Sequence, residues 1–125
     1  MADQSDVRRI ALSLPDVRQG DTGFSFGVRR GGATKGIAWV WQERLEPKKP
    51  RVPNPDVLAV RVSGEAEKQE LLSAAPDRYF TEPHYNGYPA VLVRLAAVDV
   101  EELRELLTDA WRVMAPPKLV RESGL

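Results

Sequence analysis

The chain has 125 residues, with 18 basic and 18 acidic side chains, one histidine and no cysteine. A chain of this length predicts one domain, residues 1–125, that buries a core without metal or disulfide cross-links. The lack of cysteine excludes a disulfide framework, thiolate zinc sites and a thiol nucleophile. The net charge of zero means that the molecule as a whole has no field that attracts nucleic acid.

The charges are nevertheless unevenly distributed along the chain. Residues 29–61 carry eight basic and three acidic side chains, whereas residues 62–110 carry four basic and ten acidic ones. We therefore expect a polarised surface. No stretch approaches the roughly 20 apolar residues of a membrane helix, and the N-terminus lacks a signal-type apolar run. A cytoplasmic protein that does not bind membranes is the expectation.

The first predicted element is a helix capped by Asp3 or Ser5 and ended by Pro15. Its apolar face, with the spacing of one helical side, consists of Val7, Ile10, Ala11 and Leu14. Alternating side chains then predict two strands, residues 24–28 and 37–41. We expect them to be joined through Gly31-Gly32, because glycine supplies the positive φ of a tight hairpin turn.

The middle of the chain begins with a predicted loop, residues 43–56, which holds four prolines and has no hydrophobic period. A strand over residues 57–62, a helix over 65–75 and a strand over 90–95 are predicted to follow. The last helix is expected to be capped by Asp99, with Glu102 completing a capping box, and to run to Pro116. Its apolar face consists of Val100, Leu103, Leu107, Ala110 and Met114.

This order has no alternating βαβ pattern and predicts an α+β fold, an antiparallel sheet with helices packed on one face. The other face of such a sheet can remain open to water. If Phe26, Val60 and Val91 point inward, the period of two sends Arg29, Arg61 and Arg94 to the open face. An anion or small-ligand site on that face is one functional hypothesis, with Arg61 and Arg94 as a charge clamp and His84 or Tyr85 at its rim.

The segment 76–95 contains the only histidine, His84, and all three tyrosines. A catalytic role for His84 is disfavoured, because neither HExxH nor a GxSxG serine occurs in the chain. Asn86-Gly87 is the dipeptide preferred by a type I′ hairpin turn. We therefore interpret the segment as a hairpin corner at which Tyr85 and Tyr88 form a cross-strand pair.

The basic excess is the feature with the most functional content. A hairpin and a proline-rich loop would carry the side chains that could contact phosphates, namely Arg29, Arg30, Lys35, Lys48, Lys49 and Arg51. The alternative is that these loops are simply solvated. The segment RRGGATKG is not a phosphate-binding P-loop, because its lysine precedes the last glycine. The acidic residues Glu101, Glu102 and Glu105 are interpreted as a solvated helix face rather than a metal site.

The tryptophans suggest a further role for the open face. Trp39 and Trp41 share one side of a strand, and Trp111 lies near the inward side of the last helix. We expect most of them in the core. A tryptophan left on the open face could stack on a nucleic-acid base or form a protein-interaction patch.

The strings FSFGVRRGGATKGIAWV, PHYNGYPAVLVRL and AWRVMAPPKL resemble the MmcQ/YjbR-like family of small bacterial proteins, from about Val7 to Val120. The resemblance implies a compact α+β fold, similar in shape to the bacterial frataxin-like (CyaY) proteins, and a DNA-binding role inferred from winged features. It implies no established reaction and no catalytic residues. Much of the family has a shorter connection after the first hairpin, and a tryptophan where this chain has Ala90.

The resulting prediction is a non-enzymatic nucleic-acid-binding domain without a cofactor or metal, whose partner is DNA or another nucleic acid. The alternatives are the small-ligand or anion site and the protein-interaction module on the open sheet face. The sequence leaves the oligomeric state open, with a monomer as the default expectation.

Overall fold

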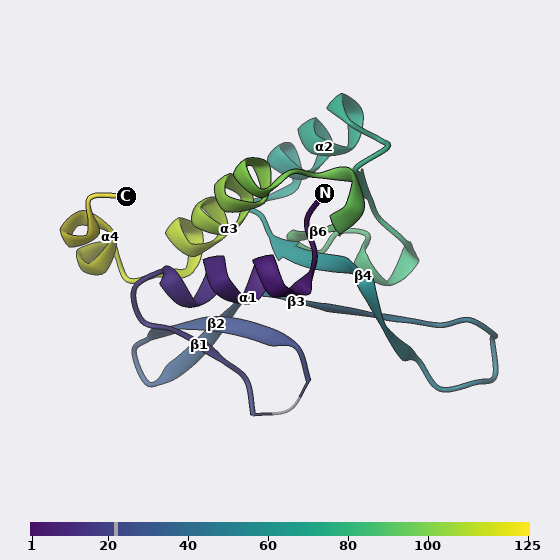
Figure 1. Cartoon of the computed structure of the whole chain (residues 1–125), viewed down its shortest axis with the longest axis horizontal. Helices are drawn as coiled ribbons and strands as arrows, with labels where there is room; N and C mark the ends of the chain where they lie inside the picture. Colours follow the sequence, from purple (N-terminus) through teal and green to yellow (C-terminus); the bar gives the residue numbers. More distant parts are fainter. Residues whose placement is uncertain (22) are drawn as a thin grey trace.

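The structure is a computed structural model that describes residues 1–21 and 23–125. Its elements in chain order are α1 (Gln4–Ser13), β1 (Val17–Gln19), β2 (Ser25–Arg30), β3 (Ala33–Glu43), β4 (Val52–Arg61), α2 (Glu65–Ala74), β5 (Tyr79–Phe80), η1 (Pro83–Tyr85), β6 (Ala90–Arg94), η2 (Leu95–Ala97), α3 (Val100–Met114) and α4 (Pro117–Ser123). The strands form one antiparallel sheet in the order β1-β2-β3-β4-β6-β5. α1 and α3 cover one face of it (Figure 1). The predicted α+β fold is confirmed.

Local signals correctly predicted the start of α1 and the first hairpin. The Asp3 carboxylate accepts the Asp6 N–H at 3.0 Å, and the Asp6 carboxylate accepts the Asp3 N–H at 3.1 Å. This reciprocal pair is a capping box, which satisfies backbone donors that the first helical turn leaves unpaired. The β2–β3 turn is formed by Gly31 and Gly32, and Gly31 has a φ of 63°.

The predicted capping box of α3 is only half formed. Asp99 accepts the Glu102 N–H at 2.7 Å, as expected. The Glu102 carboxylate, however, accepts from the Tyr79 hydroxyl and from Arg78 instead of reaching back to its own helix. A tertiary contact has therefore replaced a local one.

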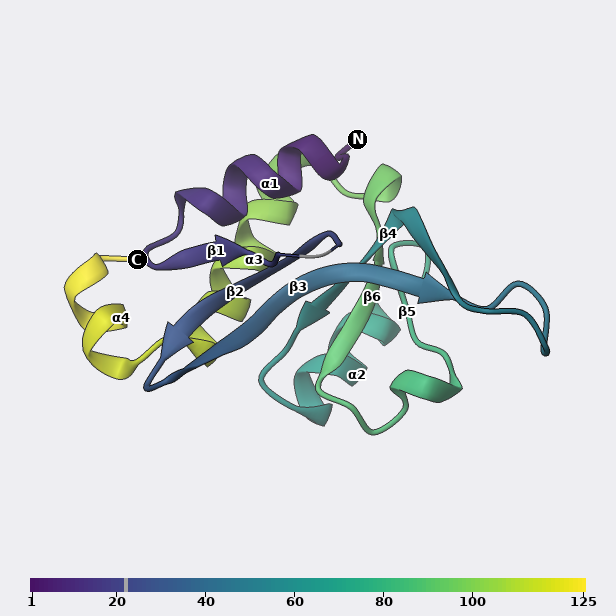
Figure 2. The same cartoon turned by 90° about the horizontal axis from the view of Figure 1, so that it is seen from below.

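The predicted loop over residues 43–56 is shorter than expected, because β3 extends to Glu43 and β4 begins at Val52. The two strands form a long arm that projects beyond the rest of the molecule (Figure 2). Pro53 and Pro55 lie in the part of β4 that pairs only with β3, since β6 pairs from Val57 onward. An open strand edge tolerates proline, which has no N–H to donate.

The predicted type I′ hairpin at Asn86-Gly87 is wrong. Asn86 has a φ of −62° and a ψ of 130°, and Gly87 has a φ of 77°. These are the angles of a type II turn, which needs positive φ only at its third residue. The Tyr88 N–H donates to the Tyr85 carbonyl at 3.0 Å, and Tyr85 belongs to η1 rather than to a strand. The two tyrosines therefore flank a turn that leads into β6.

Five elements were not predicted: β1, α4, the two-residue strand β5 and the short 3-10 helices η1 and η2. β1 is a three-residue edge strand paired with β2, too short to show a period. α4 begins at Pro117, directly after Pro116, which was interpreted only as the end of the preceding helix. Proline is equally favourable at the first position of a helix, because its missing N–H would have no partner there. In the described part of the chain, no helix combines the length and apolar character needed to cross a membrane.

Hydrophobic side chains cluster on both faces of the sheet. The helix-covered face forms the main core, with the buried residues Ile10, Phe26, Ile37, Leu58, Val60, Val91, Val93, Leu103, Leu107 and Trp111 among its members. The opposite face carries a smaller cluster of Val57, Ala59, Tyr85, Ala90 and Leu92, with Trp39, Trp41 and Phe80 partly buried against it. The expectation that most tryptophans lie in the core is therefore wrong. Two of the three lie on the open face.

Candidate functional site

The open face of the sheet contains a hollow lined by Trp39, His84, Tyr85 and Tyr88, which we call the aromatic hollow. Trp39 comes from β3, His84 and Tyr85 come from η1, and Tyr88 follows the type II turn. The volume is about 300 Å³. This size lies at the lower end of the range of small-ligand sites.

The rings of the hollow pack edge to face rather than in flat stacks. The ring centroids are 6.3 Å apart for Trp39 and Tyr88, 6.0 Å for Tyr85 and Tyr88, and 5.9 Å for His84 and Tyr85. Edge-to-face pairs are the favourable arrangement of aromatic quadrupoles. The rings therefore hold one another in place around the cavity.

Two hydrogen bonds tie the tyrosine hydroxyls to their surroundings. Trp39 Nε1 donates to the Tyr85 hydroxyl at 3.1 Å, and Arg61 Nη2 donates to the Tyr88 hydroxyl at 3.3 Å. The Arg61 guanidinium also lies 5.6 Å from the Trp39 ring centre and 5.2 Å from that of Tyr88. Arg61 therefore borders the hollow through contacts with two of the rings that line it.

A buried lysine on α2 fastens the wall of the hollow. Lys68 is 1% exposed, and its ammonium donates to the carbonyls of Tyr85 and Tyr88, the latter at 3.0 Å. Burial lowers the pKa of Lys68 from its usual value, while nearby Glu65 acts in the opposite direction. The main-chain turn that carries the two tyrosines is thus held by a group from another element.

Three of the four residues predicted for the small-ligand site are brought together and one is not. Arg61, His84 and Tyr85 gather at the hollow. Arg94 lies over Phe80, 4.1 Å from the ring centre. Arg61 pairs with Ala90 and Arg94 with Val57, so the two arginines are four residues apart along β6, or roughly 13 Å. They do not form one clamp.

Sequence reasoning missed Tyr88 and Lys68 as parts of the site. Tyr88 was interpreted only as one side of a hairpin. Lys68 stands three and four residues before Leu71 and Leu72, so its helical position marks the inward face. That spacing could have identified it, but a lysine is rarely expected to be buried.

The basic residues predicted to contact nucleic acid lie in two groups. Arg29, Arg30 and Lys35 are at the β2–β3 hairpin, whereas Lys48, Lys49 and Arg51 are at or beside the tip of the β3–β4 arm. These groups stand at opposite ends of the long axis in both views (Figures 1 and 2). They are joined by the 11 residues of β3, a strand of roughly 35 Å.

The tip of the arm is held by main-chain acceptors. Arg44 donates to the carbonyls of Pro47 and Lys49 at 3.1 and 3.0 Å, and Arg51 donates to the Gln42 carbonyl at 2.8 Å. None of the six predicted contact residues takes part in a salt bridge within residues 1–21 and 23–125. Their charge is therefore not neutralised by a carboxylate of the described chain.

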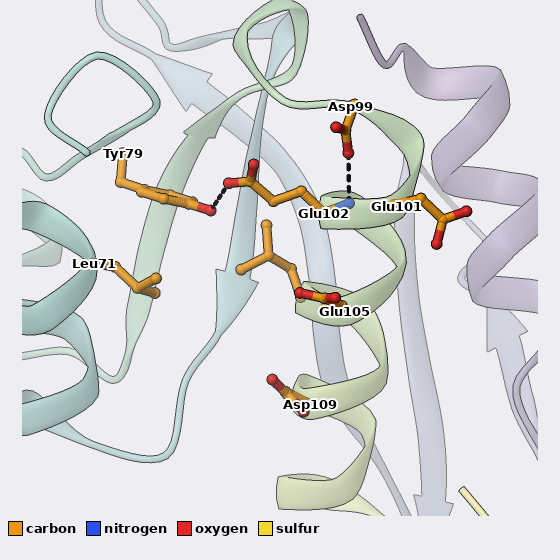
Figure 3. Close-up of a pocket in the computed structure, with 8 residues that line it drawn as sticks. Leu71, Tyr79, Asp99, Glu101, Glu102, Glu105 and Asp109 are labelled. Atoms are coloured by element: carbon orange, nitrogen blue, oxygen red, sulfur yellow. Dashed lines mark hydrogen bonds between the residues drawn. The ribbon is translucent and has the colours of Figure 1, made fainter. Parts of the chain in front are cut away.

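A second concave surface, the acidic groove, lies between α2, β5 and α3 and has a volume of about 430 Å³ (Figure 3). Its lining residues are Leu71, Tyr79, Asp99, Glu101, Glu102, Glu105, Leu106 and Asp109. The Tyr79 hydroxyl donates to Glu102, which also pairs with Arg78 at 2.7 Å. Among the described residues, no group of three or more histidines and carboxylates could hold a metal ion.

Comparisons with known proteins agree with this architecture. The family model described as YjbR matches residues 12–113. The uncharacterized proteins Mb2600 of Mycobacterium bovis and Rv2570 of Mycobacterium tuberculosis are each 39% identical to this chain over 122 residues, or 97% of this chain and 95% of theirs.

A solved structure shows the same fold. The crystal structure of Deinococcus radiodurans protein DR2400, with the family-model domain DUF419, matches with a TM-score of 0.69 at 22% identity. The match covers 100% of this chain and 90% of that one. Because the family match spans most of the chain, the resemblance noted from the sequence is confirmed, and the chain belongs to the YjbR family.

Proposed function

We propose that this protein is a non-enzymatic binding domain whose site is the aromatic hollow and whose ligand is a small molecule with a flat ring. The convergence of Trp39, His84, Tyr85 and Tyr88 around about 300 Å³ carries this proposal. These side chains come from two stretches of the chain, β3 and residues 84–88, and meet on a sheet face that α1 and α3 leave uncovered. We retain the expected cytoplasmic location as part of the proposal.

The construction of the hollow favours binding over mere packing. Aromatic walls provide a large contact area, and their rings lose little conformational freedom when a ligand binds. Lys68 fastens the turn before any ligand arrives, through its two bonds to main-chain carbonyls. A preformed site does not spend binding energy on ordering its own wall.

The composition of the lining supports a non-enzymatic role. General acid–base catalysis needs a proton donor and acceptor within reach of the reacting atoms. His84 is the only histidine among the lining residues, and no carboxylate stands beside it in the lining. The nearest aromatic neighbour of His84 is the ring of Tyr85, 5.9 Å away between centroids.

The proposal is tested by NMR titration of the labelled protein with a set of flat, ring-containing fragments. We expect saturable shifts of the Trp39 indole N–H and of the amides of residues 83–88. Trp39→Leu should abolish them. Trp41→Leu is the matched control, because Trp41 lies on the same face of β3 but packs on Phe80 outside the hollow. Equal loss in both variants, or no shifts in the parent protein, would contradict the proposal.

Nucleic-acid binding is the second candidate function. The observation that favours it is the exposure of five of the six basic residues, all but the half-buried Arg51, in two groups at the β2–β3 hairpin and at the arm. No described carboxylate neutralises their charge. Phosphate contacts by lysine and arginine release counterions and bind without reading sequence. Because the two groups lie at opposite ends of the molecule, one nucleic acid would have to extend along β3 to engage both.

Fluorescence anisotropy with duplex DNA, single-stranded DNA and RNA tests this candidate at about 50 and 200 mM salt. Two triple-alanine variants, one of Lys48, Lys49 and Arg51 and one of Arg29, Arg30 and Lys35, separate the two ends. If the two basic groups contact the same nucleic-acid molecule, each variant should bind it more weakly and show a smaller dependence of affinity on salt. Absence of binding at low salt to all three nucleic acids would eliminate the candidate.

A further inference from the structure

The polar groups at the aromatic hollow are arranged as hydrogen-bond donors. The hydroxyl oxygens of Tyr85 and Tyr88 accept bonds from Trp39 Nε1 and Arg61 Nη2 at 3.1 and 3.3 Å. A phenol that accepts one bond still has its own proton to donate. Within the described residues, neither of these two O–H groups has an acceptor. Both protons can therefore be donated to a ligand.

A positive charge also borders the aromatic hollow. The positively charged Arg61 guanidinium rests against the rings of Trp39 and Tyr88. The carboxylate closest in sequence, Glu82, precedes η1 and is not among the lining residues. A cationic ligand would have to displace Arg61 from these rings, whereas an anion would gain charge-assisted hydrogen bonds.

We infer that the aromatic hollow selects a flat aromatic acid, meaning a ring that bears a carboxylate or a phosphate, and rejects the matching aromatic cation. The ring lies against the aromatic side chains, and the anionic group accepts from the Tyr85 and Tyr88 hydroxyls and from Arg61. This inference rests on the proposed function, because it names the ligand class of the same site.

The test uses four probes that share a phenyl ring: benzoate, phenyl phosphate, benzyl alcohol and benzylammonium. Affinities are measured by NMR titration at one fixed salt concentration, with the Trp39 indole N–H as the reporter. We expect the tighter of the two acids to bind at least about tenfold more strongly than benzylammonium. The ranking of benzoate and phenyl phosphate identifies the anionic group, and inorganic phosphate alone should bind more weakly than phenyl phosphate.

Substitutions locate the source of the selectivity. Tyr88→Phe and Arg61→Gln should each weaken binding of the acid by about tenfold or more and change benzyl alcohol by less than about twofold. Tyr85→Phe should act in the same direction. Because this substitution also removes the acceptor of Trp39 Nε1, the NMR spectrum of the variant must first show an intact fold. Arg94→Gln is the control, because Arg94 lies on the same face over Phe80 and should leave every affinity unchanged.

The outcomes separate the inference from the function on which it rests. If benzylammonium binds as tightly as the acids, the anionic ligand class is overturned and the hollow remains a ring-binding site. Unchanged acid affinity in both Tyr88→Phe and Arg61→Gln also overturns the inference. If none of the phenyl probes binds, the proposed function fails together with it.

Discussion

The aromatic hollow and the acidic groove are both concave, yet they use their tyrosine hydroxyls in opposite ways. In the groove, Tyr79 donates its proton to Glu102, and that carboxylate also accepts from Arg78. In the hollow, Tyr85 and Tyr88 accept bonds and have no acceptor for their own protons within the described chain. The direction of hydrogen bonding, rather than cavity volume, thus distinguishes the two regions. The groove satisfies its own donor, whereas the hollow keeps two O–H donors for a ligand.

The electrostatics of the two regions differ in the same sense. Burial, together with the hydrogen bond to Glu102, raises the pKa of Tyr79, so the groove holds that phenol in its neutral form. Burial lowers the pKa of Lys68 behind the hollow, although two carbonyls accept its protons. Each region thus contains one buried titratable group. Tyr79 belongs to the satisfied network of the groove, whereas Lys68 supports the binding surface of the hollow.

The largest expected effect comes from breaking the support of the hollow with Lys68→Met. Each of the two main-chain carbonyls loses its charged donor and keeps only a backbone N–H, that of Tyr88 or of Ala90. We therefore expect the free energy of unfolding to fall by about 2–3 kcal/mol, with part of the loss offset because no charge is buried. Urea denaturation measures this change, and the amide shifts of residues 83–88 should report a loosened turn. Lys118→Met, at an exposed lysine whose side chain is 79% accessible, is the control. Equal effects of the two substitutions would show that Lys68 is not a support.

Removing the groove hydroxyl with Tyr79→Phe should have a smaller effect on stability and none on the hollow. The hydrogen bond to Glu102 is lost, but Arg78 still pairs with that carboxylate, so we expect a cost of about 1–2 kcal/mol. Affinity of the hollow for its ring probe should be unchanged. A loss of probe binding in this variant would show that the two regions are coupled.

The pH dependence of stability should distinguish the two buried groups. The pKa of Lys68 is lowered in the folded state, so the unfolded chain binds more protons between that pKa and the usual 10.5, and stability rises with pH there. The pKa of Tyr79 is raised, so above the usual 10.0 the unfolded chain loses its proton first, and stability falls. The free energy of unfolding, measured by urea denaturation between pH 8 and pH 11, should no longer rise with pH in Lys68→Met. In Tyr79→Phe it should no longer fall at the alkaline end of this range. Identical profiles in both variants and the parent protein would refute this assignment.

The smallest effect is expected at the rim of the groove. Glu105→Gln removes one negative charge from α3 on an exposed position that forms no hydrogen bond or salt bridge among the described residues. The free energy of unfolding should change by less than about 0.5 kcal/mol, as for most surface substitutions. Thermal unfolding and the probe titration both measure the result. A larger change in stability would mean that Glu105 takes part in the packing of the groove, and a change in probe binding would mean that the groove and the hollow are coupled.

Local patterns predicted much of the fold because their signals depend on close neighbours in sequence. The Asp3 cap, the Gly31-Gly32 turn and the apolar face of α3 were all predicted correctly. One failure occurred where a distant contact prevailed. Glu102 was predicted to cap its own helix, but it accepts from Tyr79, 23 residues earlier, which lies beside it only after folding.

The candidate site was predicted only in part, for the same reason. The period of two placed Trp39 and Trp41 on one face and sent Arg61 and Arg94 outward. It did not show that the two arginines lie over different rings. The predicted nucleic-acid residues shared a stretch of sequence, yet the length of β3 separates them into two groups.

The sequence by itself determined the single α+β domain, the sheet faces, the first helix cap and the hairpin turn. These depend on side-chain periodicity and on residue conformations that act within a few positions of the chain. Only the tertiary structure decided that Trp39 meets Tyr85 from 46 residues away, that Lys68 is buried behind them and that Arg61 lies over their neighbour Tyr88. Strand pairing and the position of α2 beside the turn that carries Tyr85 and Tyr88 create these contacts. Local sequence patterns do not encode them, because the partners are far apart along the chain.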